Sequence, residues 1–200
     1  MSGGRLSASI SAEVGRAVIA DAQLVALAHE SRADALDAMY SAYKARIYTY
    51  LLRLLADPEG ADDLTQDVFT KAYQALGTLT KEHRVLPWLY RIATNTGIDH
   101  LRRKRRFTWL RVGRLAGTGE EPVMRDQHGE LPERDQVQGI LAGLPAEQST
   151  ALLLHALEGY SYKEIAEIQG CTLTAVRSRL ARARKSFRTD YATTEARQPS

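Results

Sequence analysis

Cysteine is nearly absent from this chain of 200 residues: Cys171 is the only one, so an internal disulfide is excluded. So little cysteine is typical of a protein from a reducing compartment. The sequence also lacks any apolar run close to the roughly 20 residues that a membrane-spanning helix needs. Residues 1–15 contain no continuous apolar stretch of signal-peptide length. We therefore expect a cytoplasmic protein that does not insert into a membrane.

The residue patterns of common enzyme sites are missing as well. No phosphate-binding loop of the Gly-x-Gly-x-x-Gly or Walker type occurs. The histidines are scattered without the spacing of metal ligands; they are His29, His83, His100, His128 and His155. We therefore expect no enzyme activity, no metal and no cofactor, and we keep a redox role of Cys171 as an alternative.

Charge is nearly balanced overall, at a formal net +3, but it is segregated along the chain. Residues 54–70 hold five acids and no base, whereas residues 101–114 hold seven bases and no acid. Acidic and basic blocks in one chain favour two kinds of partner. Nucleic acid is one candidate partner for the basic blocks.

Apolar residues recur at helical spacing, and no segment alternates as a β-strand does. Three helices are predicted from these stripes, with a loop at 77–87 before the third helix at 88–106. Asp57 suits the N-cap of the second helix and Pro58 its first position. The residues expected on the core sides are Leu36, Met39, Tyr40, Tyr43, Ile47, Tyr50, Leu51 and Leu54; Leu64, Val68, Ala72, Tyr73 and Leu76; and Trp88, Leu89, Ile92, Ala93, Thr96 and Leu101.

The chain is therefore predicted to be all-α, with two small helical domains joined by a flexible linker. The linker is expected where glycine, proline and charged residues interrupt the periodicity. The predicted divisions are a loose tail at 1–20, a first domain at 21–106, the linker at 107–134, a second domain at 135–190 and a tail at 191–200.

The second domain carries the spacing of a helix-turn-helix. Ala166 lies in a short helix, Gly170 follows four residues later, and Val176 follows six residues after that. The motif needs a small residue where its helices cross, favours glycine in the turn, and needs an apolar residue that points back at the first helix. Either Thr172 or Thr174 can cap the second helix.

The second helix of this motif, within residues 172–187, has five basic residues and no acid. Its expected core side is Leu173, Val176, Leu180, Ala183 and Phe187, and its expected outer side is Arg177, Ser178, Ala181, Arg182 and Lys185. Such an outer side suits the major groove, where arginine bonds guanine edges and other side chains contact phosphates. Arg179 and Arg184 are expected to flank it. Taken alone, the helix also fits a solvated basic surface without DNA contacts.

The first domain offers two further candidate surfaces. Residues 88–106 interleave aromatic and basic side chains, which suits unstacked bases. The alternative is that Trp88 belongs to the core and that residues 102–106 form a solvated helix end. An exposed face with Asp62, Asp63, Gln66 and Asp67 favours a basic protein partner, although acids there also stabilise the start of a helix.

Taken together, three stretches resemble the extracytoplasmic function (ECF) group of bacterial sigma factors of the sigma-70 family. They are DDLTQDVFTKAYQAL at 62–76, WLYRIATNTGIDHLRR at 88–103 and YSYKEIAEIQGCTLTAVRSRLARAR at 160–184, in the family's order and spacing. The resemblance covers about residues 24–106 and 135–188. It implies an alternative sigma factor that binds core RNA polymerase, recognises the −35 and −10 promoter elements, and helps melt the −10 region. An autonomous helix-turn-helix regulator is the alternative, and it explains the second domain only.

The resemblance also implies partners and roles for single residues. The face that docks on the clamp helices of the polymerase β′ subunit is expected to hold Asp62, Asp63, Gln66 and Asp67. The −10 reader is expected to hold Lys81, His83, Trp88, Arg91, Asn95, Asp99, Arg102 and Arg103. The −35 reader is expected to hold Thr174, Arg177, Ser178, Arg182 and Lys185. Asn95 falls beside a flipped-out base of promoter DNA. Further implied partners are the β flap and an anti-sigma factor.

The chain departs from the family pattern at two places that bear on DNA. In the loop before the third helix, Leu79 and Val85 replace aromatics and Lys81 replaces glycine, so the preferred −10 base does not carry over. Thr174 and Ala175 stand where many members have Gly-Thr, which puts the phosphate contacts at that helix start in doubt.

Overall fold

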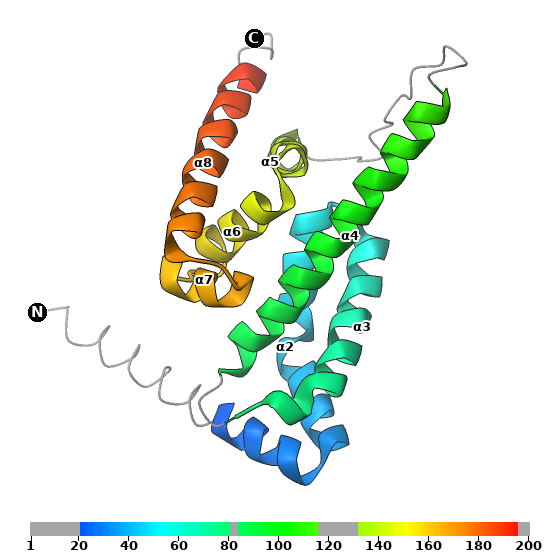
Figure 1. Ribbon diagram of the computed structural model, residues 1–200, viewed down its shortest axis with the longest axis vertical. Helices are drawn as coiled ribbons and strands as arrows, with labels where there is room; N and C mark the ends of the chain where they lie inside the picture. The colour runs from blue at the N-terminus through cyan, green and yellow to red at the C-terminus, as the bar shows by residue number, and fades with distance from the viewer. Residues whose placement is uncertain (1–20, 81–83, 116–131, 196–200) are drawn as a thin grey trace, which may run out of the picture.

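The computed structural model describes residues 21–80, 84–115 and 132–195, with side chains for 21–80, 84–107 and 137–189. Within these ranges the chain is helical with short connections and contains no strand (Figure 1), which confirms the all-α prediction. Residues 21–30 are helical, and the elements that follow are α2 (Arg32–Leu55), α3 (Pro58–Ala75), the 3-10 turn η1 (Leu76–Thr78), α4 (Val85–Leu115), α5 (Pro132–Gly143), α6 (Ala146–Ala156), α7 (Tyr162–Gln169) and α8 (Leu173–Glu195).

Side-chain caps set where the first long helices begin. The Ser31 hydroxyl accepts a hydrogen bond from the Asp34 backbone N–H at the start of α2. The Asp57 carboxylate accepts one from the Gly60 N–H, 3.1 Å away, and Pro58 follows as the first residue of α3. These bonds satisfy N–H groups that have no partner inside a helix. The predicted cap and first position of α3 are therefore confirmed.

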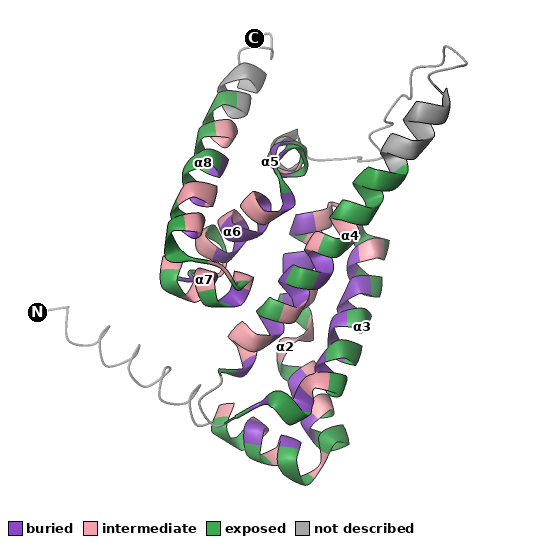
Figure 2. Ribbon diagram, viewed as in Figure 1, coloured by how far each residue is buried: buried purple, intermediate pink, exposed green. Residues whose placement is uncertain are grey.

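Helices α2, α3 and α4 pack into the first helical half, with their apolar stripes buried between them (Figure 2). The Tyr50 and Tyr90 rings meet edge to face, 5.2 Å apart, and the Tyr50 hydroxyl is hydrogen-bonded to the Thr94 hydroxyl, 2.9 Å away. Gly97 lets α4 approach α2 closely, because a Cβ there would lie 2.5 Å from the Leu54 side chain.

Two residues predicted for the core are instead exposed. Tyr73 is 41% exposed because it lies at the edge of the buried arc of α3, where the Arg32 guanidinium covers its ring at 5.2 Å. Leu173 is 38% exposed. It is the first residue of α8, and helical side chains lean towards the N-terminus, so its side chain projects beyond the helix. Trp88 and Ile92, also predicted for the core, are half-buried.

Helix α4 is longer than predicted at both ends. It begins at Val85, inside the expected loop, and it ends at Leu115, beyond the expected end at residue 106. No glycine or proline occurs between residues 98 and 112 to stop it, although the apolar periodicity fades there. The predicted linker at 107–134 thus includes the end of α4 and the start of α5. The rest of that linker, 116–131, and the predicted tail at 1–20 lie outside the described residues.

The second helical half, α5 to α8, lies against the first along α2 and α4 (Figure 1). The Tyr160 ring, from the connection between α6 and α7, packs edge to face on Tyr90 of α4 at 5.6 Å. Both tyrosines are buried, and burial raises the pKa of each hydroxyl above its ordinary value. The two halves therefore share an apolar seam in addition to polar contacts.

Candidate nucleic-acid interface

Helices α7 and α8 form the predicted helix-turn-helix. Gly170 ends α7 in the left-handed conformation, with φ of 60°, and the Cys171 N–H donates to the Ala166 carbonyl at 2.9 Å. The Thr172 hydroxyl then accepts a hydrogen bond from the Ala175 N–H at 3.2 Å, so Thr172 caps α8 and Thr174 does not. The turn predicted from the Ala-Gly-Val spacing is therefore confirmed, and its open question about the cap is resolved.

Helix α8 separates into a buried and an exposed side, as its sequence predicts. Val176, Leu180 and Ala183 are buried against the other helices. The predicted DNA-reading residues lie on the outer side, where Thr174, Arg177, Arg182 and Lys185 are exposed and Ser178 is half-buried. This basic side of α8, which we call the α8 face, is therefore open to a partner, while its contacts with DNA stay a prediction.

Two other arginines of α8 serve the motif itself. Arg179 donates to the Gln169 side-chain oxygen at 2.7 Å and to the Cys171 sulfur at 3.1 Å. Arg184 donates to the Tyr162 hydroxyl at 3.0 Å. Both arginines thus brace α8 against α7 and the turn. The sequence predicted that Arg179 and Arg184 flank the DNA-reading side of α8, but it did not predict these hydrogen-bond partners. Hydrogen bonds between α7 and α8 depend on the angle at which the two helices pack, which the local sequence does not specify.

Helix α4 presents most of the other predicted DNA-contacting residues as one stripe. Its steps of three and four residues place Trp88, Arg91, Asn95, Asp99 and Arg102 along one side of the helix, with Arg103 beside them. All but Trp88 are exposed, and Trp88 is half-buried. We call this stripe the α4 face. Lys81 and His83, predicted for the same site, lie outside the described residues.

The basic cluster at 102–106 lies inside α4, so it is not a helix end as the alternative had it, although its residues are exposed to solvent as that alternative expected. Its charge affects a neighbouring histidine. Burial lowers the pKa of His100, and the positive charges of Lys104 and Arg103 lower it further. The positive charges of Arg103 and Lys104, which lower this pKa, also favour an anionic ligand along this part of α4.

The acidic candidate surface lies on α3. Asp62, Asp63, Gln66 and Asp67 are all exposed, and the Gln66 amide donates to the Asp62 carboxylate at 3.0 Å. We call this surface the α3 face. It is open to a basic partner, as the spacing predicts.

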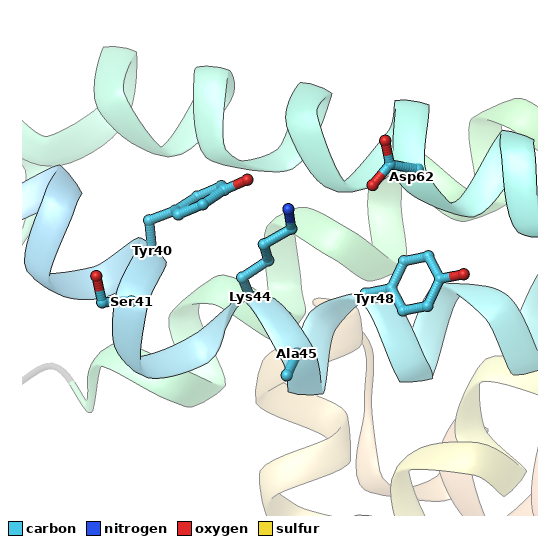
Figure 3. A pocket seen from close by; sticks show the side chains of 6 residues that line it. All are labelled: Tyr40, Ser41, Lys44, Ala45, Tyr48 and Asp62. Carbon is cyan, nitrogen blue, oxygen red and sulfur yellow. The ribbon is translucent and has the colours of Figure 1, made fainter.

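An open pocket of about 510 Å³ adjoins the α3 face and extends it onto α2 (Figure 3). Its α2 side has Tyr40, Ser41, Lys44, Ala45 and Tyr48, and Asp62 closes it from α3. The Lys44 ammonium lies 5.0 Å from the centre of the Tyr40 ring, between the two tyrosines. Sequence reasoning assigned Tyr40 to the core, against which it is half-buried, and gave Tyr48 no role; the spacing of four residues that places Tyr40, Lys44 and Tyr48 on one side of α2 was the available signal.

The described residues were also searched for a metal site and for a membrane-spanning helix. No group of three or more histidines, cysteines or acids there is arranged to hold a metal ion. None of the helices in the part of the chain that the structure describes is long and apolar enough to cross a bilayer.

Known proteins match this chain in both helical halves. Residues 39–107 match the family described as Sigma-70 region 2, and residues 134–187 match the family described as Sigma-70, region 4. The RNA polymerase sigma-H factor of Pseudomonas aeruginosa is 34% identical over 180 residues, which are 84% of this chain and 91% of that protein. The ECF RNA polymerase sigma factor SigW of Bacillus subtilis is 31% identical over 166 residues, 78% of this chain and 88% of that protein.

Solved structures agree with these matches. The sigma factor RpoE of Bartonella quintana, solved with the anti-sigma factor NepR, aligns with a TM-score of 0.58 and 25% identity, over 76% of this chain and 94% of that one. The protein CnrH, solved with the cytosolic domain of CnrY, shares the fold, with a TM-score of 0.63 and 23% identity over 90% of this chain and 99% of that one. Both sigma-70 regions and relatives above 30% identity cover most of the sequence, so the chain belongs to the ECF group of the sigma-70 family and is an alternative sigma factor of RNA polymerase.

Proposed function

We propose that three exposed faces divide the work of this sigma factor. The α3 face docks on core RNA polymerase, the α4 face reads and helps open the −10 element, and the α8 face reads the −35 element. The observation that carries this division is charge: one acidic surface lies on α3, and two basic surfaces lie on separate helices. An acidic face repels DNA phosphates and attracts a basic protein surface, whereas basic faces do the opposite.

For the α3 face, the proposed partner is the pair of clamp helices of the β′ subunit. The four residues of this face are exposed; they are Asp62, Asp63, Gln66 and Asp67. Among the hydrogen bonds and ion pairs resolved for the described residues, none joins them to a basic side chain. Their carboxylates are therefore available to arginine or lysine of a partner.

For the α4 face, the proposed chemistry is capture of an unstacked base. Asn95 is exposed in the middle of the stripe, with Trp88 and Arg91 towards the start of the helix and Arg102 towards its end. An amide reads the edge of a flipped-out base, while arginines hold the backbone on either side. Lys81 and His83, in the preceding loop, complete the proposed site.

For the α8 face, Arg177 is the proposed base reader and Lys185 a phosphate contact. Arg177 lies one turn into the helix, where a recognition helix approaches base edges, and Lys185 lies two turns further along. Thr174 lies between the cap and Arg177, Ser178 follows Arg177 directly, and Arg182 completes the set. Because Thr172 supplies the cap, the Thr174 hydroxyl is free to contact a phosphate.

We further propose that the chain performs no reaction of its own and works in the cytoplasm, with the β flap as a second contact on core polymerase. An anti-sigma factor is a further proposed partner, since the Bartonella relative was solved with one. The division into a first domain at 21–106, a linker at 107–134 and a second domain at 135–190 also belongs to this proposal, with α4 continuing into the linker.

The deciding experiment is run-off transcription with core polymerase on a promoter library, together with a pull-down on core. Asn95→Ala should impair open-complex formation far more than core binding, and Asp67→Lys should do the reverse. Asp37→Lys, at an exposed acid on α2, is the matched control for charge. If the chain fails to bind core but binds duplex DNA tightly alone, the autonomous regulator is correct and this proposal is wrong.

The −35 role of the α8 face is tested separately by single changes on α8. Arg177→Ala should weaken preference at one −35 position by about 1–3 kcal/mol, whereas Lys185→Ala should weaken binding to all sequences and flatten its salt dependence. If neither change alters DNA binding, α8 is not the −35 reader.

A further inference from the structure

A hollow of about 640 Å³ lies among α2, α5, α6 and α8, and residues of all four helices line it. Helices α5 and α6 both pack on α8, and α2 approaches α5 and α6 from the first helical half (Figure 1). None of the lining residues belongs to the α3, α4 or α8 face. The hollow is therefore a feature of this chain to which the proposed function gives no role.

The walls of the hollow are apolar. They include Val137, Leu141, Leu152, Leu157 and Phe187. Leu157 is 47% exposed, which makes it one of the few large apolar side chains open to solvent among the described residues. Pockets for small ligands measure about 300–1,000 Å³ and are lined mostly by apolar side chains, with a few polar groups that orient the ligand. The hollow has this size and this lining.

The charged side chains at the hollow are all of one sign. Among the described residues that line it, the charged ones are Arg53 of α2 and Arg184 and Arg188 of α8, and none is an acid. Arg184 donates to the Tyr162 hydroxyl. In contrast, none of the ion pairs resolved for the described residues involves Arg53 or Arg188, and both side chains are exposed.

Helix ends account for only one of these two free cations. Arg53 lies in the last turn of α2, where a positive charge is favourable without any ligand. Arg188 lies about two turns before the end of α8, so it has no such role. Two cations at the rim of one apolar hollow, with no carboxylate between them, favour an anionic group at that rim.

The size of the hollow favours a hydrocarbon chain over a protein helix. A helix with its side chains is about 10–12 Å across. A cube of the same volume as the hollow measures only about 9 Å on a side, so a helix would lie on the hollow and leave its interior unfilled. An unbranched alkyl chain, in contrast, fits inside and contacts the walls along its length.

We propose that this hollow binds a single-chain anionic amphiphile, with its alkyl chain against the apolar walls and its carboxylate or phosphate head between Arg53 and Arg188. Guanidinium groups pair with both kinds of head through two parallel hydrogen bonds. The chain supplies most of the affinity, and the two arginines set the direction in which the ligand enters. The proposal does not rest on the roles given to the three faces.

Calorimetric titration of the full chain with octanoate, decanoate and dodecanoate, each below its micelle concentration, tests the proposal. One molecule should bind per chain, and the affinity should rise by up to about 4-fold for each added methylene group that is buried. Dodecanoate should also raise the midpoint of thermal unfolding, because it binds the folded chain only. Dodecyl phosphate identifies the preferred head, and dodecyltrimethylammonium, with the same chain and the opposite charge, should bind more weakly than either anion.

Two pairs of variants place the ligand in the hollow. Leu157→Asp puts a negative charge in the apolar wall and should lower the affinity for dodecanoate by about 10-fold or more. Its control is Leu173→Asp, at a leucine that is 38% exposed and lies outside the hollow. Arg188→Gln is a milder change and should weaken binding by about 1.5- to 5-fold, as expected for an exposed ion pair. Its control is Arg106→Gln, at an exposed arginine of α4 outside the hollow. Neither control should alter binding, and the unfolding midpoint of each variant without ligand checks that it is folded.

Three results would each overturn the proposal: dodecanoate does not bind, it binds both members of each variant pair equally, or the cationic amphiphile binds as tightly as the anions. If dodecanoate does not bind and Leu157→Asp nevertheless weakens the pull-down on core polymerase, the hollow docks a protein instead. None of these variants alters a residue of the α3, α4 or α8 face. Failure of this proposal therefore leaves the proposed function standing, and failure of the proposed function leaves this proposal standing.

Discussion

The turn of the helix-turn-helix offers a stability prediction that the structure makes quantitative. Gly170 has φ of 60° and ψ of 41°, and its N–H donates to the carbonyls of α7. An L-residue in this left-handed conformation costs about 1–2 kcal/mol. A Cβ at this position would meet nothing within 4 Å, so no steric cost is added. Gly170→Ala should therefore destabilise the chain by about 1–2 kcal/mol through the backbone alone.

The assay is thermal unfolding followed by circular dichroism, with −35 duplex binding measured well below the midpoint. The midpoint should fall by about 2–4 °C for each kcal/mol, as expected for a chain of this size. Affinity for the duplex should change less than about twofold, because none of the residues of the α8 face is altered and nearly all molecules are still folded.

Gly139→Ala is the matched control. Gly139 lies inside α5, and a Cβ there also meets nothing within 4 Å, but its φ is not in the left-handed region. Alanine is a better helix former than glycine, so this change should stabilise by up to about 1 kcal/mol. The reasoning is refuted if Gly170→Ala leaves the midpoint unchanged, or if both variants lose stability equally.

Three further predictions follow from single contacts. Thr172→Ala should cost about 0.5–2 kcal/mol by removing the cap of α8, whereas Thr174→Ala should leave urea unfolding unchanged; equal effects would contradict the cap. Tyr50→Phe should lower the free energy of unfolding by about 1–3 kcal/mol, because the buried Thr94 hydroxyl loses its partner. Adding Thr94→Val should recover part of this loss in the same urea assay. Purely additive losses in the double variant would argue against the hydrogen bond. Burial raises the pKa of Glu147, but its hydrogen bonds lower that pKa more, to below the ordinary 4.5. The protein with Glu147 should therefore be more stable than the Glu147→Gln variant at neutral pH, and this difference should vanish as the pH falls below about 4.5. A difference in unfolding free energy that does not change with pH would falsify this.

Local patterns predicted the features that depend on neighbours in sequence. The Asp57 cap, the glycine turn at Gly170 and the buried stripe of α8 each follow from residues within a few positions of one another. The exposed acids of α3 were predictable for the same reason, because helical spacing alone puts them on one side. Their agreement with the structure reflects how strongly capping and burial constrain a short helix.

Features that depend on distant residues were not predictable in this way. Tyr73 belongs to an apolar pattern, yet it is exposed, and its ring contacts the guanidinium of Arg32 from the helix before it instead of the core. Helix α4 continues to Leu115 although no apolar periodicity near that end predicts a helix. Above all, Arg84 and Glu164 are 80 residues apart, and nothing in either neighbourhood specifies their pairing. Such contacts arise from the way whole helices pack.

The arginines of α4 illustrate why an internal contact and a DNA contact can share the same side chains. Guanidinium groups bind carboxylates and phosphates with the same planar geometry, so a glutamate on α7 is a fair substitute for a phosphate. The arginines of the three ion pairs between the two halves that are resolved in the described residues are at least half exposed, so solvent screens each pair. The Tyr90–Tyr160 contact and the hydrogen bonds of Arg105 add to these pairs, so the two halves are joined by apolar as well as polar contacts.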